Sequence, residues 1–413
     1  MRVFIFIYKV LSKLTYALLH GIAIFNPKLK KGIKGRKETL DKIRAFRSKN
    51  INKVIWFHCA SLGEFEQAMP LIEWIRENKK KHAIAVSFFS PSGYEPNKNN
   101  PLLDIAFYLP FDTSKNLTKL IKILNPEKVY VVKYEFWYNF LNNIHHFKIP
   151  LYLISAYFLP EQIFFKKYGF FHRKMLHFFN HIFVQDKDSK KLLENIKITN
   201  VSIVGDTRID RAITTKNNQV KLLHIEQWQD PKKKTIIAGS TWKEDIKLLS
   251  TTQLSSTDYQ WIIAPHNINN EEISYIKKQF NSWEICLWTE VAHQNSIPQN
   301  KNLIILNTIG ILKSIYQYAD IVWIGGGFNK SGIHNCIEAA VFNKPLFWGP
   351  NYSRFKEAKD LIRLQGAYSL STNVAFEEKI RNRAQIKNQE EIVGLYIHAQ
   401  KGATASIVAF TES

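Results

Sequence analysis

The stretch IVWIGGGFNKSGIHNCIEAAVFNKPLFWGPNY, residues 321–352, decides how the chain can fold. Its apolar run at 321–324 is typical of a buried parallel strand, and the three glycines at 325–327 predict a loop whose backbone comes close to a ligand. Two alanines favour a helix over residues 334–342, and a second short strand starts at Pro345. Strand, glycine-rich loop, helix and strand together predict half of a nucleotide-binding unit.

Three polar side chains, His334, Asn335 and Glu338, stand at the start of the predicted helix. The first N–H groups of a helix are free and attract phosphate, and Glu338 can reach a hydroxylated group bound at the same end. A purely structural helix start needs only one capping residue. The cluster therefore favours a ligand site, although any α/β protein has such strand–helix–strand units and three glycines can simply make a turn.

Apolar runs elsewhere predict two parallel sheets, because they alternate with helical patterns such as residues 65–76 and 114–124. The predicted strands are residues 54–60, 83–90, 105–111, 129–136, 151–158 and 182–186 in the first half and 235–241, 261–266, 303–306, 321–324 and 345–349 in the second. The polar residues 204–219 between the halves are a plausible linker. Two Rossmann-like domains facing across a cleft, without a G-x-G-x-x-G motif, suggest by analogy the GT-B glycosyltransferase architecture.

Length and composition agree with two globular domains. A chain of 413 residues is too long for one core and suits two domains of about 200 residues each. Its three cysteines, Cys59, Cys286 and Cys336, lie far apart, which argues for a reducing compartment and against zinc. The net charge of +22 predicts an anionic partner, which could be nucleic acid, an anionic membrane or a phosphorylated substrate.

The first 25 residues predict a helix with two faces. Polar side chains recur on one face (Arg2, Lys9, Lys13, Tyr16, His20) and apolar ones on the other (Phe4, Ile7, Leu11, Leu14, Leu18, Ile22). The longest uncharged run, residues 14–27, is shorter than the ~20 residues that span a bilayer, and no signal-peptide cleavage site follows. The basic residues 28–37 favour anionic lipid on the cytoplasmic side. We expect this helix to lie in the membrane surface; a tilted span or packing on its own protein stays open.

Glu64 is the candidate general base in the first half. In HCASLGEFEQAMPLI, residues 58–72, it stands where a predicted strand ends and a helix begins. A carboxylate at that edge of a parallel sheet points into the ligand crevice, and glycosyl transfer to an alcohol requires a base that takes the hydroxyl proton. On spacing alone, a surface glutamate stabilised by the helix dipole is the favoured interpretation. Glu66, two residues further along, faces elsewhere.

The stretch GGGFNKSGIHNCIEAAVFNKPLFWGPNYSRFKEA, residues 325–358, resembles the donor-site signature of the Kdo (3-deoxy-D-manno-octulosonic acid) transferases. Those enzymes attach Kdo from CMP-Kdo to a lipid A precursor, and matching elements recur over about residues 1–370. SLGE at 61–64 matches the family's S-x-G-E, which implies that Glu64 is the catalytic base. The resemblance also implies an acceptor side at Ser61, Gly63, Ser92 and Gly93 and a CMP-binding set at His266, Asn267, Ile309, Gly310, Ile311, His334, Asn335, Cys336, Ile337 and Glu338.

Other motifs match the family with departures. Residues 238–245, AGSTWKED, match a family loop in which Ser240 and Thr241 could bond donor oxygens, and a helix cap completed by Glu244 is equally compatible. Arg208 is a further possible donor contact. The departures are Asp206 and Arg208 for the family's asparagine and lysine, His266 and Asn267 for its arginine and histidine, and Ile311 for its glutamate. Main-chain contacts at Ile309 and Gly310 would survive the last change, and we expect Glu135 and Trp137 to support the crevice wall.

The combined expectation is an inverting, metal-independent Kdo transferase of lipopolysaccharide biosynthesis with a GT-B fold. Residues 1–37 would form the membrane-associating helix and its polybasic flank, 38–205 the acceptor domain and 206–413 the CMP-Kdo domain. The phosphate of CMP would lie near His334 and Asn335, and the ribose or base near Glu338. No cofactor or metal is expected, since no D-x-D motif stands in a suitable loop, so helix dipole and side chains would meet the charge on the departing CMP.

The expected partners are CMP-Kdo, a lipid A precursor and the anionic surface of the cell inner membrane, on its cytoplasmic face, with no nucleic acid. Two alternatives stay open. A GT-B enzyme that uses a UDP-sugar would need more basic groups at the glycine loop than Lys330. A basic membrane- or nucleic-acid-binding protein without catalysis would need exposed aromatics among its lysines and arginines to bind bases, whereas the aromatics here lie mostly in apolar runs.

Overall fold

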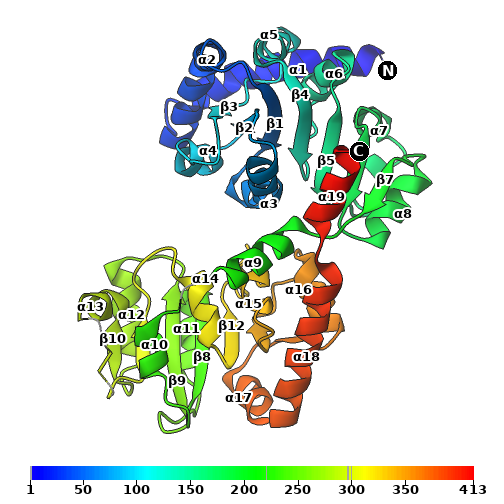
Figure 1. Cartoon of the computed structure of the whole chain (residues 1–413). Coiled ribbons are helices and arrows are strands. Elements are labelled where there is room, and N and C mark those ends of the chain that lie inside the picture. The colour runs from blue at the N-terminus through cyan, green and yellow to red at the C-terminus, as the bar shows by residue number, and fades with distance from the viewer. Residues whose placement is uncertain (1, 220, 295–296, 299) are drawn as a thin grey trace. The chain divides into compact units, whose positions relative to one another are not determined.

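The computed structural model describes residues 2–219, 221–294, 297–298 and 300–413. The chain forms two compact units, Met1–Arg211 with Lys401–Ser413, and Ala212–Gln400 (Figure 1). The expected division into 1–37, 38–205 and 206–413 therefore needs three corrections, because residues 1–37, 206–211 and 401–413 all belong to the first unit.

Residues 206–211 and 401–413 belong to the first unit because hydrogen bonds at the predicted linker hold them there. Residues 207–217 form a helix, α9 (Thr207–Asn217), and its first turn is bonded into the first unit. The hydroxyl of Thr207 donates to the carbonyl of Gln67 (2.7 Å). The Asp210 carboxylate accepts the N–H groups of Gly402 (2.7 Å) and Thr404 (2.6 Å), so it also holds the returning C-terminal segment.

The first unit is a seven-stranded parallel sheet in the order β3-β2-β1-β4-β5-β6-β7. Its strands are β1 (Lys53–Cys59), β2 (His82–Phe88), β3 (Ile105–Tyr108), β4 (Pro126–Val132), β5 (Leu151–Ala156), β6 (His181–Val184) and β7 (Val201–Ile203). The six predicted strands are confirmed, and β7 was missed because three residues give no periodicity to detect. Strand order reverses between β1 and β4, which is where ligands bind in such sheets.

Helices cover both faces of this sheet, and the central strand shows why. Trp56 of β1 packs into the apolar layer on one face, whereas its neighbours Ile55 and Phe57 pack into the layer on the other. Ile407 from the C-terminal segment joins the second layer. The helices that follow the strands are α3 (Leu62–Asn78), α4 (Pro91–Asn97), α5 (Ser114–Leu124), α6 (Tyr138–His146), η1 (Ile163–Phe165), α7 (Phe170–Leu176), α8 (Lys187–Asn195) and α19 (Ala403–Thr411).

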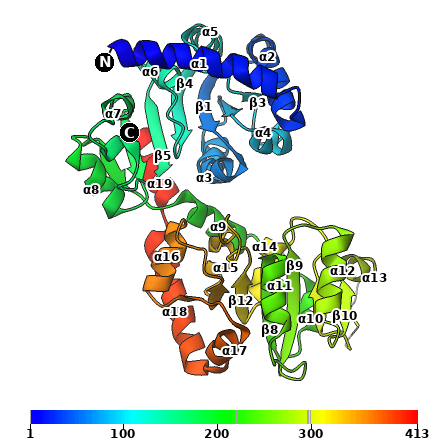
Figure 2. The ribbon, with the colours of Figure 1, turned by 180° about the vertical axis from the view of Figure 1, so that it is seen from behind.

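Two further helices, α1 (Arg2–Ile22) and α2 (Pro27–Arg47), precede the sheet, and Figure 2 shows α1 running across this unit toward α2. The predicted apolar face of α1 is exposed, and a different strip, including Ile5 and Tyr8, packs on the protein. The predicted polar residues Lys9 and Tyr16 are exposed as well, while the side chains of Arg2, Lys13 and His20 lie outside the described residues. The basic residues 28–37 are the first turns of α2. In the described chain, no helix has the length and apolarity to cross a bilayer.

The second unit repeats the design, with a seven-stranded parallel sheet in the order β10-β11-β9-β8-β12-β13-β14. Its strands are β8 (Lys234–Thr241), β9 (Tyr259–Pro265), β10 (Ile285–Leu287), β11 (Leu303–Ile305), β12 (Ile321–Ile324), β13 (Leu346–Trp348) and β14 (Ala367–Ser369). The five predicted strands are confirmed, and the short edge strands β10 and β14 were missed. Strand β12, on which the prediction of this fold rested, lies between β8 and β13 in the sheet.

The helices of the second unit are α10 (Leu223–Trp228), α11 (Lys243–Ser250), α12 (Asn270–Gln279), α13 (Trp288–Gln294), α14 (Leu312–Ile315), η2 (Tyr316–Tyr318), α15 (Ile337–Ala340), α16 (Lys356–Arg363), α17 (Asn373–Arg381) and α18 (Arg383–Gln400). One prediction is wrong in extent. The helix expected over residues 334–342 is the four-residue α15, and residues 334–336 lie in the loop before it.

Candidate active site

The Glu64 carboxylate is bound to the loop that follows β1. Helix α3 starts at Leu62, so Glu64 is its third residue and its side chain turns back toward the strand end. Its Oε2 accepts the N–H of Ala60 in a short hydrogen bond and lies 3.3 Å from the N–H of Ser61. The backbone therefore fixes this carboxylate at the carboxyl edge of the central strand, and the side chain stays half-buried.

A second carboxylate, that of Glu135, belongs to the same neighbourhood and is held from two sides. Nε2 of the buried His58, on β1, lies 3.3 Å from its Oε2, and the indole N–H of Trp137 donates to the same oxygen at 2.7 Å. The other ring nitrogen of His58 bonds the Ser87 hydroxyl (2.9 Å). Glu135 and Trp137 thus hold each other in place, and their role in a crevice wall stays a prediction. His58 was missed because a histidine inside a strand is usually a core residue.

These two glutamates differ in acidity. Burial raises the pKa of Glu64, and the Glu135 charge raises it further, while the Ala60 N–H, His58 and Lys133 offset part of this. Burial alone would raise the pKa of Glu135 too, but its bonds to His58 and Trp137 hold that pKa below its usual value. Pairs of carboxyl groups whose environments separate their pKa values are typical of acid–base sites. Glu64 is the more basic of the two.

Of the four predicted acceptor-side residues, Ser61 bonds this carboxylate, Gly63 precedes it, and Gly93 packs against the Ser61 loop. A Cβ on Gly93 would stand 2.5 Å from the Phe88 ring and 3.0 Å from the Ser61 carbonyl carbon, so only glycine lets α4 approach the Ser61 loop this closely. A Cβ on Gly63 would meet open space. Ser92 bonds the Ser90 hydroxyl at 2.9 Å. The structure thus brings the loops after β1 and β2 together.

Arg208 requires a correction, because it was grouped with the donor-binding residues of the second domain. It lies in the first unit, where its guanidinium donates to both carboxylate oxygens of Asp206, to Oδ2 at 2.6 and 3.0 Å and to Oδ1 at 3.2 Å. Burial alone would raise the pKa of Asp206, but the Arg208 and Lys133 charges hold it below its usual value. The two departures from the family pattern at these positions therefore form one internal ion pair.

In the second unit, a stack of three rings unites residues from distant parts of the chain. The ring of His266 stacks against the rings of both Trp242 and His334, with its centroid 4.5 Å from each of theirs. The Trp242 indole N–H donates to Nε2 of His334 (3.1 Å). Burial, followed by the His266 ring, lowers the pKa of His334 to about 4, so this imidazole is neutral at physiological pH. His266 and His334 were among the predicted site residues, whereas Trp242 was not. Asn267, the predicted residue that follows His266, is exposed.

Glu338 joins the two predicted donor-binding segments. Its Oε1 lies 3.2 Å from the Asn335 side-chain amide and 3.3 Å from Nζ of Lys313, which follows the Ile309–Gly310–Ile311 segment on α14. Gly310 has φ +96° and open space at its Cβ position. Ile309 is 92% exposed, so this segment presents backbone and side chain to solvent.

The prediction of free N–H groups at the helix start is wrong for two positions. The N–H of His334 donates to the Gly325 carbonyl (3.0 Å), and that of Ile337 donates to the Asn335 side chain (3.1 Å). The side chains of Cys336 and Ile337 are buried, so they face the core. Contact with a ligand at this loop therefore falls to side chains such as Asn335 and Glu338.

The glycine loop is also built for internal packing rather than close approach to a ligand. A Cβ on Gly325 would lie 2.3 Å from the Ser240 carbonyl oxygen, and one on Gly327 would lie 2.5 Å from the Gly349 nitrogen. The buried Asp245 carboxylate holds this loop by accepting the N–H groups of Gly326 and Trp242, both at 2.9 Å.

The same interactions correct the helix cap expected nearby. Trp242 caps α11 with Asp245 as its partner, one residue later than the predicted pairing of Ser240 or Thr241 with Glu244. Thr241 is buried, whereas Ser240 is partly exposed. In the described residues, no group of three or more His, Cys, Asp or Glu side chains is placed to hold a metal ion.

A family model described as 3-deoxy-D-manno-octulosonic-acid transferase (kdotransferase) matches residues 34–211. The chain is 25% identical to a 3-deoxy-D-manno-octulosonic acid transferase of Aquifex aeolicus over 367 residues, covering 84% of this chain and 93% of that protein. The chain belongs to the Kdo transferase family. It is therefore a glycosyltransferase.

Further similarities extend over most of this Kdo transferase. It is 24% identical to the 3-deoxy-D-manno-octulosonic acid transferase of Chlamydia trachomatis serovar A, covering 77% of this chain and 75% of the relative. A crystal structure of UDP-N-acetylglucosamine 2-epimerase superposes with a TM-score of 0.59 at 13% identity, covering 88% of this chain and 97% of that one. At that identity the likeness shows the fold alone. The GT-B prediction, two Rossmann-like units with parallel sheets, is confirmed.

Proposed function

We propose that this enzyme transfers Kdo from CMP-Kdo to a hydroxyl group of a lipid A precursor, with Glu64 as the general base. The observation that carries the assignment of the base is the Glu64 carboxylate, which backbone N–H groups fix at the edge of β1 and whose pKa is raised by burial and by Glu135. A base with a pKa raised toward neutral pH is better matched to its task than an ordinary surface glutamate.

In the proposed reaction the acceptor hydroxyl lies against Glu64. The carboxylate takes the hydroxyl proton as the oxygen forms its bond to the anomeric carbon of Kdo. The bond between that carbon and the phosphate oxygen breaks, and CMP leaves with the electron pair. Attack on the face opposite CMP inverts the configuration. No metal enters this scheme, so side-chain and backbone dipoles stabilise the leaving phosphate.

For the donor, we propose binding at the ring stack and at the Glu338 cluster of the second unit. A carboxylate such as Glu338 accepts hydrogen bonds from ribose hydroxyls or from the amino group of cytosine. Asn335 and Lys313, which lie within 3.3 Å of it, offer donors to phosphate or base. Neutral His334 can donate or accept a hydrogen bond without adding charge.

For localisation, we propose the cytoplasmic face of the inner membrane. The apolar side chains of α1 that point away from the protein support this placement, because an amphipathic helix of this kind lies in the headgroup region. The basic first turns of α2, which carry Lys30, Lys31, Lys34 and Lys37, would add attraction to anionic lipids.

Two measurements test the proposal. Incubation of the enzyme with CMP-Kdo and a lipid A precursor, followed by mass spectrometry, should show a product heavier by one or more Kdo residues and release of CMP. Titration calorimetry should show binding of CMP but much weaker binding of UDP and of single-stranded DNA. Preference for UDP would point to a UDP-sugar donor, and absence of any product from CMP-Kdo would overturn the proposal.

A further inference from the structure

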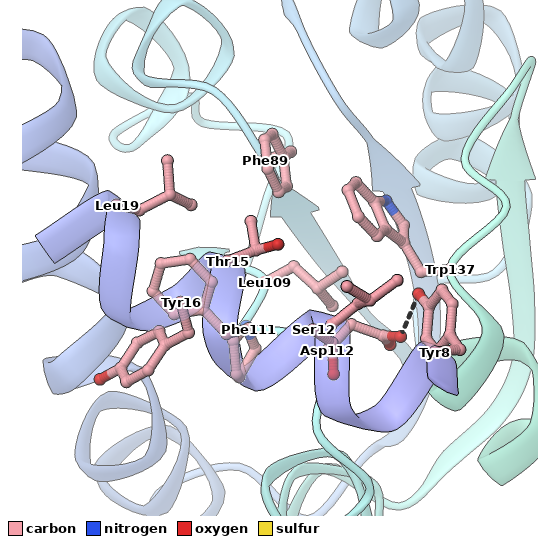
Figure 3. A pocket seen from close by; sticks show the side chains of 12 residues that line it. Tyr8, Ser12, Thr15, Tyr16, Leu19, Phe89, Leu109, Phe111, Asp112 and Trp137 are labelled. Atoms are coloured by element: carbon pink, nitrogen blue, oxygen red, sulfur yellow. Dashed lines mark hydrogen bonds between the residues drawn. The ribbon is translucent and has the colours of Figure 1, made fainter. Parts of the chain in front are cut away.

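The first unit contains an apolar cavity of about 280 Å³ between α1 and the loops that follow β2 and β3 (Figure 3). Its walls include Leu11, Thr15 and Leu19 from α1 and Phe89, Phe111 and Trp137 from the sheet side. At one end, the Tyr8 hydroxyl donates to the Asp112 carboxylate at 2.6 Å. Asp112 also accepts bonds from the backbone of Asn139 (3.0 Å) and Phe140 (2.8 Å), so its oxygens are already satisfied.

Beside this cavity lies a buried cation. Arg36, on α2, is 9% exposed, and its guanidinium lies over the rings of Phe89 (4.7 Å) and Phe111 (5.0 Å), which also line the apolar cavity. It donates to the carbonyls of Gly32 (3.0 Å) and Phe89, and its buried Nε finds no acceptor. Within the described chain, no carboxylate contacts it.

Arg36 keeps its charge and faces open space. Burial lowers its pKa to about 10, which leaves the guanidinium protonated at neutral pH. It lines two further cavities, of about 320 and 180 Å³. A buried cation without an anion carries a large desolvation cost, and a planar guanidinium is well suited to bind phosphate.

Residues that line these cavities are hydrogen-bonded to the loop that holds Glu64 and to Glu135. Ser90 lines the larger Arg36 cavity, and its N–H donates to the carbonyl of Ala60 (2.8 Å), whose own N–H bonds Glu64. Trp137 lines the apolar cavity and donates to Glu135. A ligand that fills these cavities is thus adjacent to the loops that hold Glu64 and Glu135.

The apolar cavity also opens toward the outer surface of α1. Leu11 lines the cavity and is 55% exposed, and its neighbours Ile7 and Leu14 belong to the exposed apolar face. Leu11 therefore belongs both to the lining of the cavity and to the exposed apolar face of α1.

We infer that the apolar cavity takes one acyl chain of the acceptor lipid and that Arg36 binds a phosphate group of the same molecule. This inference rests on the proposed function, because it assigns a role to the acceptor's own groups. The occupant that fits is an amphiphile with an alkyl chain and an anionic group near the hydroxyl that reacts. A free phosphate would leave the apolar cavity unused, and a neutral lipid would leave Arg36 unpaired.

Filling the cavity tests the acyl-chain site. Thr15→Trp places an indole at a cavity-lining position, and Tyr168→Trp places the same indole at an exposed position of the first unit that does not line the cavity. We expect Thr15→Trp to raise the KM for the acylated acceptor by about tenfold or more, since loss of about two buried methylene groups has that effect. The KM for a deacylated acceptor should not change, and Tyr168→Trp should match the wild type. Equal acylated-acceptor KM values for Thr15→Trp and wild type would overturn this part.

Changing Arg36 tests the phosphate site. Arg36→Met keeps the apolar stem but removes the charge, and Arg36→Lys keeps a charge. Arg36→Met should weaken binding of the phosphorylated acceptor by about tenfold or more, the usual value of a charge-assisted hydrogen bond. It should leave binding of the dephosphorylated acceptor unchanged, and Arg36→Lys should restore part of the loss. Equal losses on both acceptors would overturn the phosphate assignment.

Two controls separate this inference from the function on which it rests. If the wild type transfers no Kdo, the proposed function fails whatever the cavity binds. If it transfers Kdo and all variants keep wild-type KM values, only the acyl and phosphate sites fail. Vesicles of a simple anionic phospholipid serve as competitor: competition as strong as that of the acceptor would show a general lipid site and overturn the acceptor assignment.

Discussion

Nε2 of His58 lies 3.3 Å from Oε2 of Glu135, and this contact keeps the second carboxylate of the site ionised. The negative charge so held raises the pKa of Glu64, which the Ala60 and Ser61 N–H groups fix at the end of β1. A buried histidine on the central strand thus influences the proposed base through a neighbouring glutamate.

The first prediction concerns the base itself. Glu64→Gln keeps the size of the side chain and an oxygen for the Ala60 N–H but cannot take a proton. We expect kcat to fall by roughly 10²–10⁴, with CMP binding unchanged. Glu66→Gln is the matched control, because Glu66 forms an ion pair with Arg211 (3.1 Å) and has no proposed chemical role. Near-normal turnover in a folded Glu64→Gln variant would remove Glu64 as the base.

The second prediction is that Glu64→Gln, although it lowers kcat, does not lower the stability of the folded protein at neutral pH. Because folding raises the pKa of Glu64, the folded state binds its proton more tightly than the unfolded state does. The free energy of unfolding therefore falls as pH rises from the usual glutamate pKa through the raised value. Glu64→Gln removes this cost, so its Tm at neutral pH should equal or exceed that of the wild type. If Glu64 had only a structural role, Glu64→Gln would have a lower Tm than the wild type. Thermal melts of both proteins at pH 4 and pH 7 measure this difference.

A third prediction uses Glu135 to move the pH profile. The base must be ionised, so kcat should fall on the acid side as Glu64 is protonated. Glu135→Gln removes the charge that raises the pKa of Glu64, while its amide oxygen can still accept from Trp137. The acid limb of the kcat–pH profile should therefore shift to lower pH. An unshifted limb would mean that Glu135 does not act on the group that titrates.

The fourth prediction tests the donor site through nucleoside binding. Glu338→Ala should weaken binding of cytidine and of CMP by about tenfold each, the value of a lost hydrogen bond to a charged group. The two ligands should weaken alike because the proposed contact is to ribose or base. Glu284→Ala is the control, since Glu284 also pairs with one lysine, Lys301 (3.2 Å), and has no proposed role in donor binding. Unchanged affinities for Glu338→Ala would exclude this residue from the site.

Membrane association is tested on the exposed face of α1. Ile7, Leu14 and Leu18 point away from the protein, so their combined replacement by glutamine should preserve Tm. Vesicle affinity should fall by about a hundredfold or more, since partitioning gains about 0.8 kcal/mol per buried methylene group. The same change at the exposed Tyr168, Val374 and Leu395 is the control. Undiminished flotation of the α1 variant with anionic vesicles would place the anchor elsewhere.

The structure also shows why substitutions on α1 test membrane association better than removal of the helix does. Removal of residues 1–25 is the obvious test from the sequence, where α1 stands apart from the active-site motifs. However, Tyr8 donates to the buried Asp112, and its ring packs against those of Tyr138 and Phe171. Truncation would leave Asp112 without one of its donors, which costs about 1–3 kcal/mol for a buried group. We therefore expect the truncated enzyme to melt at a lower temperature.

Most of the strands, and the position of Glu64 at a strand end, could be predicted from the sequence because they depend on residues that are close together in the chain. Apolar runs of four to eight residues between helical patterns predicted eleven of the strands, including β12 and its glycine loop. The position of Glu64 at a strand end followed from the same reading. Edge strands of three residues, such as β10, were not predicted because so short a run shows no hydrophobic periodicity. The extent of α15 was overestimated because two alanines favour a helix that the surrounding loop contacts cut short.

What the sequence by itself determined is therefore the order of the elements, the strand ends on which polar residues stand, and the family. Only the tertiary structure decided which of those residues meet. It joined His58 to Glu135 and His266 to His334, moved Arg208 and the last thirteen residues into the first unit, and buried Arg36 beside an apolar cavity. The physical reason is that a strand or helix depends on side-chain periodicity over a few residues. A buried charge, a ring stack or a cavity depends on the summed packing of segments far apart in the chain, which no local pattern records.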